Sequence, residues 1–399
     1  MYIADLHIHS KYSRATSKEC VPEYLELWAR KKGISLLGTG DFTHPAWRKE
    51  LWEKLEPAEP GLYTLKKEFQ FPEGPDAQST SVRFVVTGEI SSIYKKNGKV
   101  RKVHNLILLP SLEAAEELSR RLELIGNIHS DGRPILGLDS RDLLETALEA
   151  APEAVFIPAH IWTPHFSLFG AFSGFDSIEE CFEDLTPHIH ALETGLSSDP
   201  PMNWRISALD SYTLISNSDA HSPAKLGREA NLLETELSYS ELANAIQGRN
   251  PDGLLGTIEF FPEEGKYHYD GHRNCHLCLK PSETEQYGGR CPICGKKITI
   301  GVQHRVEQLA DRPEGFVKPN GKAFESLVPL PEVIAASTSH SPASVKVLAQ
   351  YEAMLKRLGS EFSILRETPL EEIGKAAGPC IQAVSYTHLR AHETRGNLV

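Results

Sequence analysis

The chain has 399 residues, of which 24% are charged and 40% are hydrophobic, a composition typical of a soluble globular protein with room for two or more domains. Acidic residues outnumber basic ones by 54 to 42, giving a formal net charge of −12, so any nucleic-acid site must be a local basic patch. No apolar run approaches the ~20 residues that a transmembrane helix needs, and the first residues lack a secretory signal pattern, so we expect a cytoplasmic protein without membrane attachment.

Short strand-like segments alternate with helical patterns through the first 255 residues, which is typical of a parallel sheet or barrel. A proline at its first position and a glycine after its last predict a helix over 22–32. Strands are expected at 2–8, 35–39, 84–87, 106–109, 155–158, 189–192 and 213–216. Side chains that can bind metal follow most of these strands. Because the carboxyl ends of parallel strands open onto one face, the pattern predicts one shared site.

Two histidines, His7 and His9, lie on the same side of the first expected strand and can share one cation. An H-x-H pair alone is weak evidence of a metal site. Here Asp219 follows a late strand and Glu89 follows another, and carboxylates can hold two cations close together. The joint occurrence favours a metal centre. Glu193, at a further strand end, could be a ligand or a general base.

Four of the seven cysteines form two C-x2-C pairs separated by twelve residues, namely Cys275, Cys278, Cys291 and Cys294. Four thiolates at this spacing predict a closed tetrahedral zinc site, so we expect a four-cysteine zinc ribbon within residues 256–313. A disulfide framework would spread paired cysteines through the fold, and a redox site would need one C-x-x-C beside a βαβ unit. We therefore predict structural Zn²⁺.

Residues 314–383 begin with a loop rich in Pro and Gly and continue with helical patterns. One apolar face ends at Gly359, and a capping box formed by Thr368 and Glu371 opens a further short helix. Residues 384–399 show no apolar period and resemble a read-through segment, so we expect a non-native tail there.

The metal-capable motifs occur in the order His7-x-His9, Asp41 with His44, Glu89, His104, His160 and Asp219-x-His221. This order resembles the polymerase-and-histidinol-phosphatase (PHP) superfamily of metal-dependent phosphoesterases. The resemblance implies an α/β fold, a distorted (β/α)7 PHP barrel over residues 1–255, with two or three divalent metals (Zn²⁺, Mn²⁺ or Mg²⁺) at the strand ends.

The same resemblance implies a role for each motif. One metal is assigned to His7, His9, Glu89 and Asp219, a second to Glu89, His104 and His160, and a third to His221 with the region of Asp41 and His44. The catalytic residues implied in this way are His7, Glu89 and Asp219. Whether Asp41 or His44 is the ligand stays open, because these two residues are adjacent in many family members and separated here.

The barrel motifs, the four-cysteine ribbon and the segments 38–45, 130–134, 216–223 and 302–312 together are similar to the endonuclease Q family. That similarity implies a metal-dependent endonuclease acting in DNA repair, which nicks DNA on the 5′ side of deaminated bases (uracil, hypoxanthine and xanthine) and at abasic sites. Its expected partners are damaged DNA and a sliding clamp.

Two basic segments are candidates for binding that DNA. The first surrounds an Asn-Gly turn signal with five basic residues, Lys95, Lys96, Lys99, Arg101 and Lys102, although a solvated hairpin tip explains it equally well. The second, residues 266–305, contains seven basic and three acidic residues. Near the expected metal site, Arg133 could bind a phosphate, and His165 is either a substrate contact or structural.

Two alternative functions remain open at this point. A PHP-type phosphatase acting on a small phosphate ester would use the same ligands, although it has no need of a basic zinc module. A non-catalytic nucleic-acid-binding zinc protein would keep the ribbon, although the ligands at each motif favour catalysis.

Overall fold

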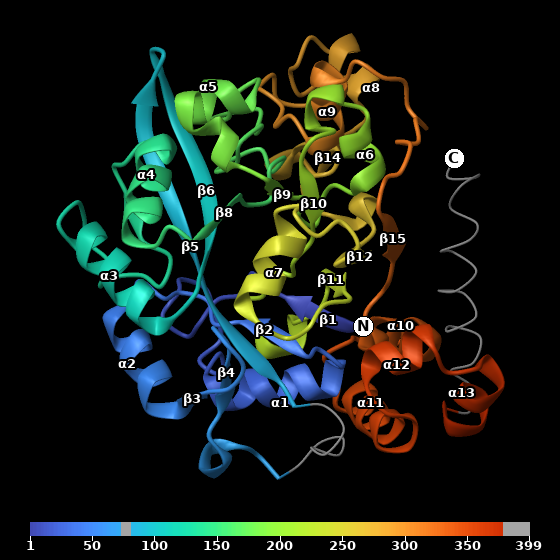
Figure 1. Ribbon diagram of the computed structural model, residues 1–399. Helices are drawn as coiled ribbons and strands as arrows, with labels where there is room; N and C mark the ends of the chain where they lie inside the picture. Colours follow the sequence, from blue (N-terminus) through green and yellow to red (C-terminus); the bar gives the residue numbers. More distant parts are fainter. Residues whose placement is uncertain (73–80, 378–399) are drawn as a thin grey trace.

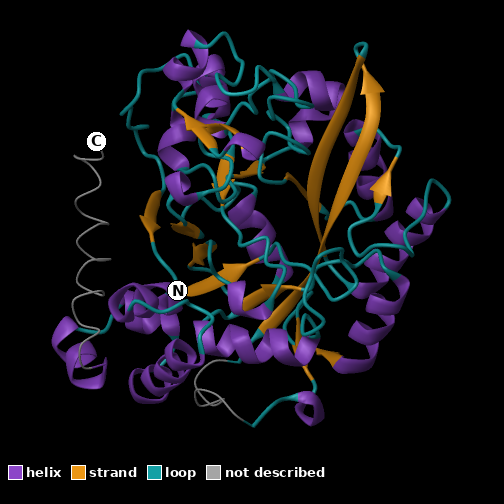
Figure 2. Cartoon of the chain, turned by 180° about the vertical axis from the view of Figure 1, so that it is seen from behind, coloured by secondary structure: helices purple, strands orange, loops and turns teal. Residues whose placement is uncertain are grey.

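The computed structural model describes residues 1–72 and 81–377 and shows helices surrounding a central mixed sheet (Figures 1 and 2). The strands are β1 (Tyr2–Asp5), β2 (Leu36–Gly38), β3 (Leu55–Pro57), β4 (Tyr63–Leu65), β5 (Arg83–Lys96), β6 (Lys99–Leu109), β7 (Ile135–Leu136), β8 (Val155–Pro158), β9 (Ala191–Glu193), β10 (Thr213–Ile215), β11 (Ala230–Leu233), β12 (Leu254–Glu259), β13 (Asp270–His272), β14 (Leu277–Leu279) and β15 (Ala323–Ser326). The α-helices are α1 (Pro22–Lys32), α2 (Pro45–Lys54), α3 (Leu112–Glu123), α4 (Ser140–Ala150), α5 (Ile178–Phe182), α6 (Pro200–Trp204), α7 (Tyr239–Ile246), α8 (Pro281–Gln286), α9 (Val302–Leu309), α10 (Leu330–Thr338), α11 (Val345–Leu358), α12 (Glu361–Arg366) and α13 (Leu370–Ala377). The expected tail at 384–399 lies outside the described residues.

The central sheet contains eleven strands in the order β15-β12-β11-β1-β2-β5-β4-β3, with β6 paired to β5 and β8, and β7 paired to β5. Strands β1, β2 and β5 are parallel, as the alternating pattern predicts, whereas β1–β11, β11–β12, β5–β6 and β6–β8 are antiparallel. Strands β9 and β10 form a separate parallel pair. The pairing is therefore mixed, unlike the all-parallel arrangement that the strand and helix rhythm alone suggests.

A two-residue turn explains the longest antiparallel pair. Asn97 and Gly98 have φ of 52° and 73° and connect β5 to β6, with Lys96 opposite Lys99. Positive φ at both positions is the geometry that Asn-Gly adopts in tight hairpins. The resulting hairpin rises along one side of the molecule (Figure 1) and carries Glu89 and His104 on its two strands.

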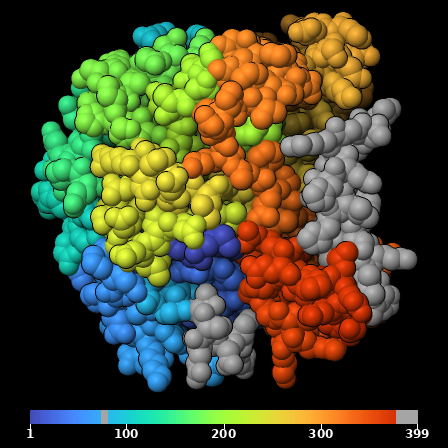
Figure 3. All heavy atoms as spheres, turned by 45° about the vertical axis from the view of Figure 1, so that its right-hand side comes forward, coloured from blue at the N-terminus to red at the C-terminus, as the bar shows by residue number. Residues whose placement is uncertain are grey.

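The ribbon segment contains the small antiparallel pair β13–β14 and the helices α8 and α9. The chain then returns to the central sheet, because β15 pairs in parallel with β12. In Figure 3 the ribbon segment lies at the top of one face and the C-terminal helices lie at its bottom. The boundaries expected at 255 and 313 stay predictions.

Helices α10 to α13 enclose a small core of their own and pack against α1. The rings of Trp28 and Tyr351 are stacked 6.2 Å apart, and Lys32 forms a buried ion pair of 2.7 Å with Glu361. The helix expected to end at Gly359 does end there, and Ser344 caps its start by accepting from the Val347 N–H. Within the described residues, no helix is long and apolar enough to cross a membrane.

Candidate metal centre and its surroundings

Four buried or half-buried side chains converge beyond the ends of β1 and β10 and along β5. The ligand atoms of His7, His9, Glu89 and Asp219 all lie within 4.8 Å of one another. His9 Nε2 is 2.9 Å from Asp219 Oδ1 and 3.3 Å from Glu89 Oε2, and His7 Nε2 is 3.6 Å from the same Glu89 oxygen. These are the residues that the PHP resemblance assigns to one metal.

A second group contains Glu89, His104 and His160, all buried. His104 Nδ1 lies 2.6 Å from Glu89 Oε1, and His160 Nε2 lies 3.0 Å from that oxygen. Glu89 therefore turns one carboxylate oxygen to each group. This is the arrangement of a carboxylate that bridges two cations.

Hydrogen bonds from outside the two groups fix the orientation of their histidines. His7 Nδ1 lies 3.0 Å from both carboxylate oxygens of Glu193, and His160 Nδ1 lies 3.1 Å from Thr163 Oγ1. His7 Nε2, on the other side of the ring, is buried and has no hydrogen-bond partner among the residues that the structure describes. An imidazole held by a carboxylate at one nitrogen and unpaired at the other is suited to bind metal, so the residues present fit divalent cations.

Asp41 holds the ring of His9 in the way that Glu193 holds the ring of His7. Its Oδ1 lies 3.0 Å from His9 Nδ1, while its Oδ2 accepts from the backbone N–H and the hydroxyl of Ser10 and from the hydroxyl of Ser13. With both oxygens engaged, Asp41 orients His9 in this structure and does not join either group of candidate ligands.

His44 and His221 also lie outside the two groups. His44 Nε2 is 3.0 Å from the carbonyl oxygen of His129. His221 Nδ1 is 2.8 Å from the carbonyl oxygen of Asp219, and its ring centroid lies 4.5 Å from that of His9. A third metal held by Asp41, His44 and His221 therefore stays a prediction.

The charge balance of the site favours cations. Burial opposes protonation of His7 and His9, but the surrounding carboxylates outweigh it and raise the pKa of both imidazoles well above the usual range. Burial would raise the pKa of Glu89, but His104, Arg133 and His7 hold it well below its ordinary value. Burial is the largest influence on His104, whose pKa falls to about 4. The buried carboxylates thus stabilise positive charge, which bound cations would supply.

Three residues at this site have a left-handed backbone conformation that side chains other than glycine rarely adopt. Asp41, His160 and Asp219 have φ of 49°, 31° and 48°. Such conformations cost on the order of 1–3 kcal/mol each and persist where the surrounding structure imposes them. Their coincidence at one site is typical of a functional centre.

Arg133 lies at the edge of the centre, where its Nη1 donates to Glu89 Oε2 at 2.9 Å. The side chain is 25% exposed, so part of the guanidinium faces solvent. Glu89 is also the largest cause of the raised pKa of Arg133. The position beside the metal-ligand groups fits the phosphate contact expected from the sequence.

The five basic residues of the hairpin tip differ in their exposure and in their contacts. Lys96 forms ion pairs with Asp139 and Glu183, and Arg101 is buried with its guanidinium over the Phe175 ring. Lys95 and Lys99 are exposed. Lys102 is half-buried, with its Nζ 5.0 Å from the ring of Phe166. Of the five predicted residues, Lys95 and Lys99 are the most accessible.

A loop beyond β8 brings aromatic side chains next to the second metal-ligand group. Phe166 packs against His104, with ring centroids 4.9 Å apart. His165 stacks on Phe172 at 4.6 Å, and both are exposed, Phe172 to 49%. Phe172 was not among the predicted site residues, because a single phenylalanine between small residues gives no signal of its own.

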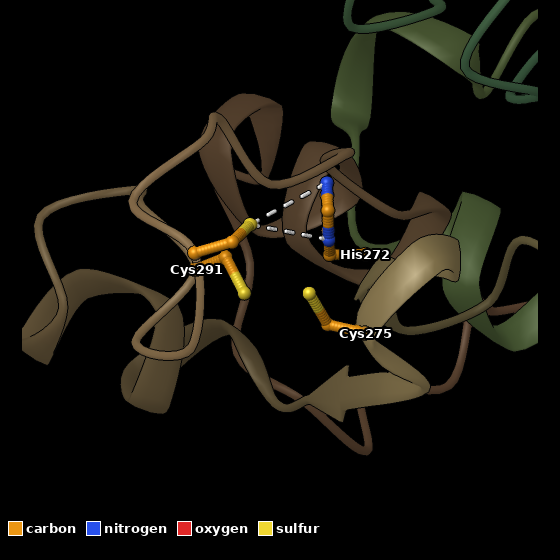
Figure 4. Close-up of side chains that lie close together, drawn as sticks. His272, Cys275 and Cys291 are labelled. Atoms are coloured by element: carbon orange, nitrogen blue, oxygen red, sulfur yellow. Dashed lines mark hydrogen bonds between the residues drawn. The ribbon is translucent and has the colours of Figure 1, made fainter.

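The structure brings three of the four ribbon cysteines together. Cys275, Cys291 and Cys294 lie with His272 in one group whose ligand atoms are within 4.8 Å of one another (Figure 4). Cys278 is exposed and does not belong to this group. His272 was not predicted, although its position three residues before Cys275 is a recognisable metal-ligand spacing.

Asn217 was also missed as a contributor to the centre. Its Nδ2 donates to Glu193 Oε1 at 2.9 Å, and its Oδ1 accepts from the backbone N–H of Leu6. It thereby connects the start of the chain to the carboxylate that orients His7. Its position two residues before Asp219 is the only sequence signal.

Comparisons with known proteins extend over almost the whole chain. Residues 329–386 match the family model of the MJ0043 C-terminal domain. The uncharacterized protein YqxK of Bacillus subtilis (strain 168) is 29% identical over 392 residues, which cover 94% of this chain and 91% of that protein. The uncharacterized protein MJ0043 of Methanocaldococcus jannaschii is 31% identical over 222 residues, which cover 54% of this chain and 27% of that protein.

Two solved structures resemble both the sequence and the fold. The lesion-specific endonuclease PfuEndoQ from Pyrococcus furiosus is 31% identical, with a TM-score of 0.83 and coverage of 98% of this chain and 91% of that chain. Endonuclease Q in complex with a 27-mer duplex substrate with an abasic lesion at the active site is 30% identical, with a TM-score of 0.84 and coverage of 98% and 92%. Because this similarity spans nearly the full length of both chains, the protein belongs to the endonuclease Q family of lesion-specific DNA endonucleases.

Proposed function

We propose that this protein is a metal-dependent repair endonuclease that nicks one DNA strand beside a damaged nucleotide. The observation that carries the proposal is Glu89, whose two carboxylate oxygens face two different groups of buried ligands. Cations bound by these groups would activate water and neutralise the charge that develops on the phosphodiester. The metals are two divalent ions of the Zn²⁺, Mn²⁺ or Mg²⁺ type, with a third at His221 and either Asp41 or His44.

The protein's own residues hold and orient this centre. His7, Glu89 and Asp219 are the ligands on which we expect cleavage to depend most. Glu193 and Asp41 keep the imidazoles of His7 and His9 in the orientation that leaves Nε2 facing the ligand group. The exposed part of the Arg133 guanidinium donates to a phosphate oxygen, because arginine presents several N–H donors in a fixed plane.

The hairpin tip and the ribbon contact the DNA on either side of the centre. Lys95 and Lys99 lie at the tip of the hairpin that also carries Glu89. The stretch of β5 between Glu89 and Lys96 spans roughly 23 Å of extended strand, about seven base pairs of duplex. On the ribbon, the exposed basic residues are Lys266, Arg273, Lys280, Arg290, Lys296 and Lys297.

The stacked pair His165 and Phe172 contacts a nucleobase next to the lesion. Two exposed aromatic rings beside a buried metal centre offer a flat surface, and stacking on such a ring stabilises a bound base by about 1–3 kcal/mol. Phe172→Ala should therefore weaken binding of lesion-containing duplex by about five-fold or more, without changing metal content. Unchanged affinity would show that the pair has only a structural role.

Several finer features follow from the family resemblance. We infer cleavage on the 5′ side of uracil, hypoxanthine, xanthine and abasic sites, and an interaction with a sliding clamp. We also infer that the strands of the central sheet other than β15, together with β9–β10, form the distorted barrel expected over residues 1–255, followed by the ribbon (256–313) and the helical region (314–383). In support, the Ile161 N–H donates to the Glu193 carbonyl oxygen at 3.0 Å, and the Ser216 N–H donates to Asn231 Oδ1 at 3.0 Å, which link β8 to β9 and β10 to β11.

A cleavage assay on end-labelled duplexes tests the proposal. Duplexes carrying one uracil, hypoxanthine, xanthine or abasic site, or no lesion, are incubated with Mn²⁺ or Mg²⁺, and 4-nitrophenyl phosphate is supplied in parallel. We expect one nick immediately 5′ of each lesion, an intact undamaged duplex and no cleavage in EDTA. Hydrolysis of the small ester alone would favour a phosphatase, and DNA binding without cleavage would favour a non-catalytic protein.

A further inference from the structure

The short sheet of the ribbon determines which side chains can share a metal. Strands β13 and β14 are antiparallel, with Gly271 opposite Cys278 and His272 opposite Leu277. Directly opposed residues lie on the same face of a sheet, and consecutive residues lie on opposite faces. His272 and Leu277 therefore share one face, and Cys278 lies on the other.

The face of the β13–β14 sheet that carries His272 and Leu277 is the one that packs against the small hydrophobic core of the ribbon. Leu279 and Cys291 belong to its small buried cluster, and Cys275 and Leu277 pack against it. Leu277 and Leu279 flank Cys278 in the strand, and because Leu279 is buried and Leu277 packs against the same cluster, the thiol of Cys278 faces outward. Cys278 accordingly lies outside the group formed by His272, Cys275, Cys291 and Cys294.

The distances on the inner face suit a tetrahedral ion. Cys294 Sγ lies 3.7 Å from His272 Nδ1, and bond lengths of about 2.3 Å to sulfur and 2.0–2.1 Å to nitrogen place such atoms about 3.6 Å apart around zinc. In Figure 4 the sulfur atoms of Cys275 and Cys291 point into the space in front of the His272 ring. All four ligand atoms lie within 4.8 Å of one another.

We propose that the ribbon binds one Zn²⁺ through His272, Cys275, Cys291 and Cys294, and that Cys278 remains a free, accessible thiol. A zinc complex with three thiolates and one imidazole carries one unit less negative charge than the four-thiolate complex expected from the spacing. The difference lies within residues 266–305, where seven basic residues face three acidic ones, so it favours contact with a polyanion. The assignment rests on the ribbon alone and is independent of the activity of the barrel centre.

Zinc content of purified full-length variants tests this assignment. Cys275→Ser defines the metal content of the barrel alone. Cys278→Ser should retain the same zinc per chain as the parent, whereas His272→Ala should lose one zinc or release it to a weak chelator. His272→Cys should recover the zinc, which separates a lost ligand from a general failure to fold.

Cobalt substitution counts the thiolates independently. The thiolate-to-Co²⁺ charge-transfer absorption should be unchanged in Cys278→Ser and should rise by about one third in His272→Cys, because three thiolates become four. Iodoacetamide should modify Cys278 in the native parent with the zinc retained. Loss of zinc in Cys278→Ser, full zinc affinity in His272→Ala, protection of Cys278, or equal zinc in the parent and Cys275→Ser would each overturn the proposal.

Discussion

Replacing Glu193 by glutamine tests the hydrogen-bond network that orients His7. Glu193 accepts from Asn217 Nδ2 at 2.9 Å through Oε1 and from the His160 backbone N–H at 2.8 Å through Oε2. Asn217 cannot reverse its amide, because its Oδ1 already accepts from the Leu6 N–H. In Glu193→Gln the new NH2 group must therefore face a donor in either orientation.

The size of the effect follows from that mismatch. A buried donor left without an acceptor costs about 1–3 kcal/mol of unfolding free energy, and Glu193 is 1% exposed. Loss of an outer partner of a metal-binding histidine typically lowers metal affinity or activity by about 10–100-fold, which corresponds to about 1.4–2.7 kcal/mol. We expect both effects in Glu193→Gln, although its shape is nearly unchanged.

Metal titration by calorimetry, with nicking rates measured at saturating metal, provides the assay. Glu229→Gln is the matched control: it is also a fully buried glutamate, whose pKa burial and Glu259 raise well above the ordinary value, and its replacement leaves the contact between Glu193 and His7 in place. The control should bind metal like the parent. Equal metal affinity in Glu193→Gln and the parent would refute the orienting role of Glu193.

Two further predictions concern DNA binding and pH. The double variant Lys95→Ala/Lys99→Ala should weaken binding to damaged and undamaged duplexes alike and reduce the slope of log K against log salt by about 1.8. The Lys96 side chain is ion-paired, so Lys96→Ala should change the slope little. Equal slopes in both variants would reject the hairpin as a DNA contact. Burial raises the pKa of Glu259 to about 8 from an ordinary value of 4.5, so the folded state holds a proton that the unfolded chain releases, and the unfolding free energy should fall as pH rises from about 5 to 8. Glu259→Gln removes this titrating carboxyl and should flatten the fall in chemical denaturation at several pH values, and an unchanged pH profile would contradict the assignment to Glu259.

Local signals predicted the elements that position the centre. Helix α1 spans Pro22–Lys32 and β8 spans Val155–Pro158, as expected, because proline, glycine and β-branched residues mark their ends. The strand expected at 2–8 ends at Asp5, since the chain turns there to bring His7 and His9 toward Asp219. The site geometry overrides the local preference for a longer strand.

What the sequence could not show is which partner each side chain takes. Asp41 is a good metal ligand by type, but Ser10 and Ser13 occupy one of its oxygens. Cys278 fits a metal knuckle by spacing, but strand alternation turns it away from His272. Both outcomes depend on register and on residues distant in sequence, which spacing alone does not encode.

The proposed metal-dependent nicking is tested by single-turnover cleavage of a duplex with one uracil by the parent and by Asp219→Ala, with DNA affinity measured in parallel. We expect a nick immediately 5′ of the uracil by the parent, with the base still attached, and none in EDTA. Asp219→Ala should retain DNA binding and nick at least about a thousand-fold more slowly, because a ligand shared with His7 and His9 is lost. Robust nicking by Asp219→Ala, or free uracil as the first product, would contradict this mechanism.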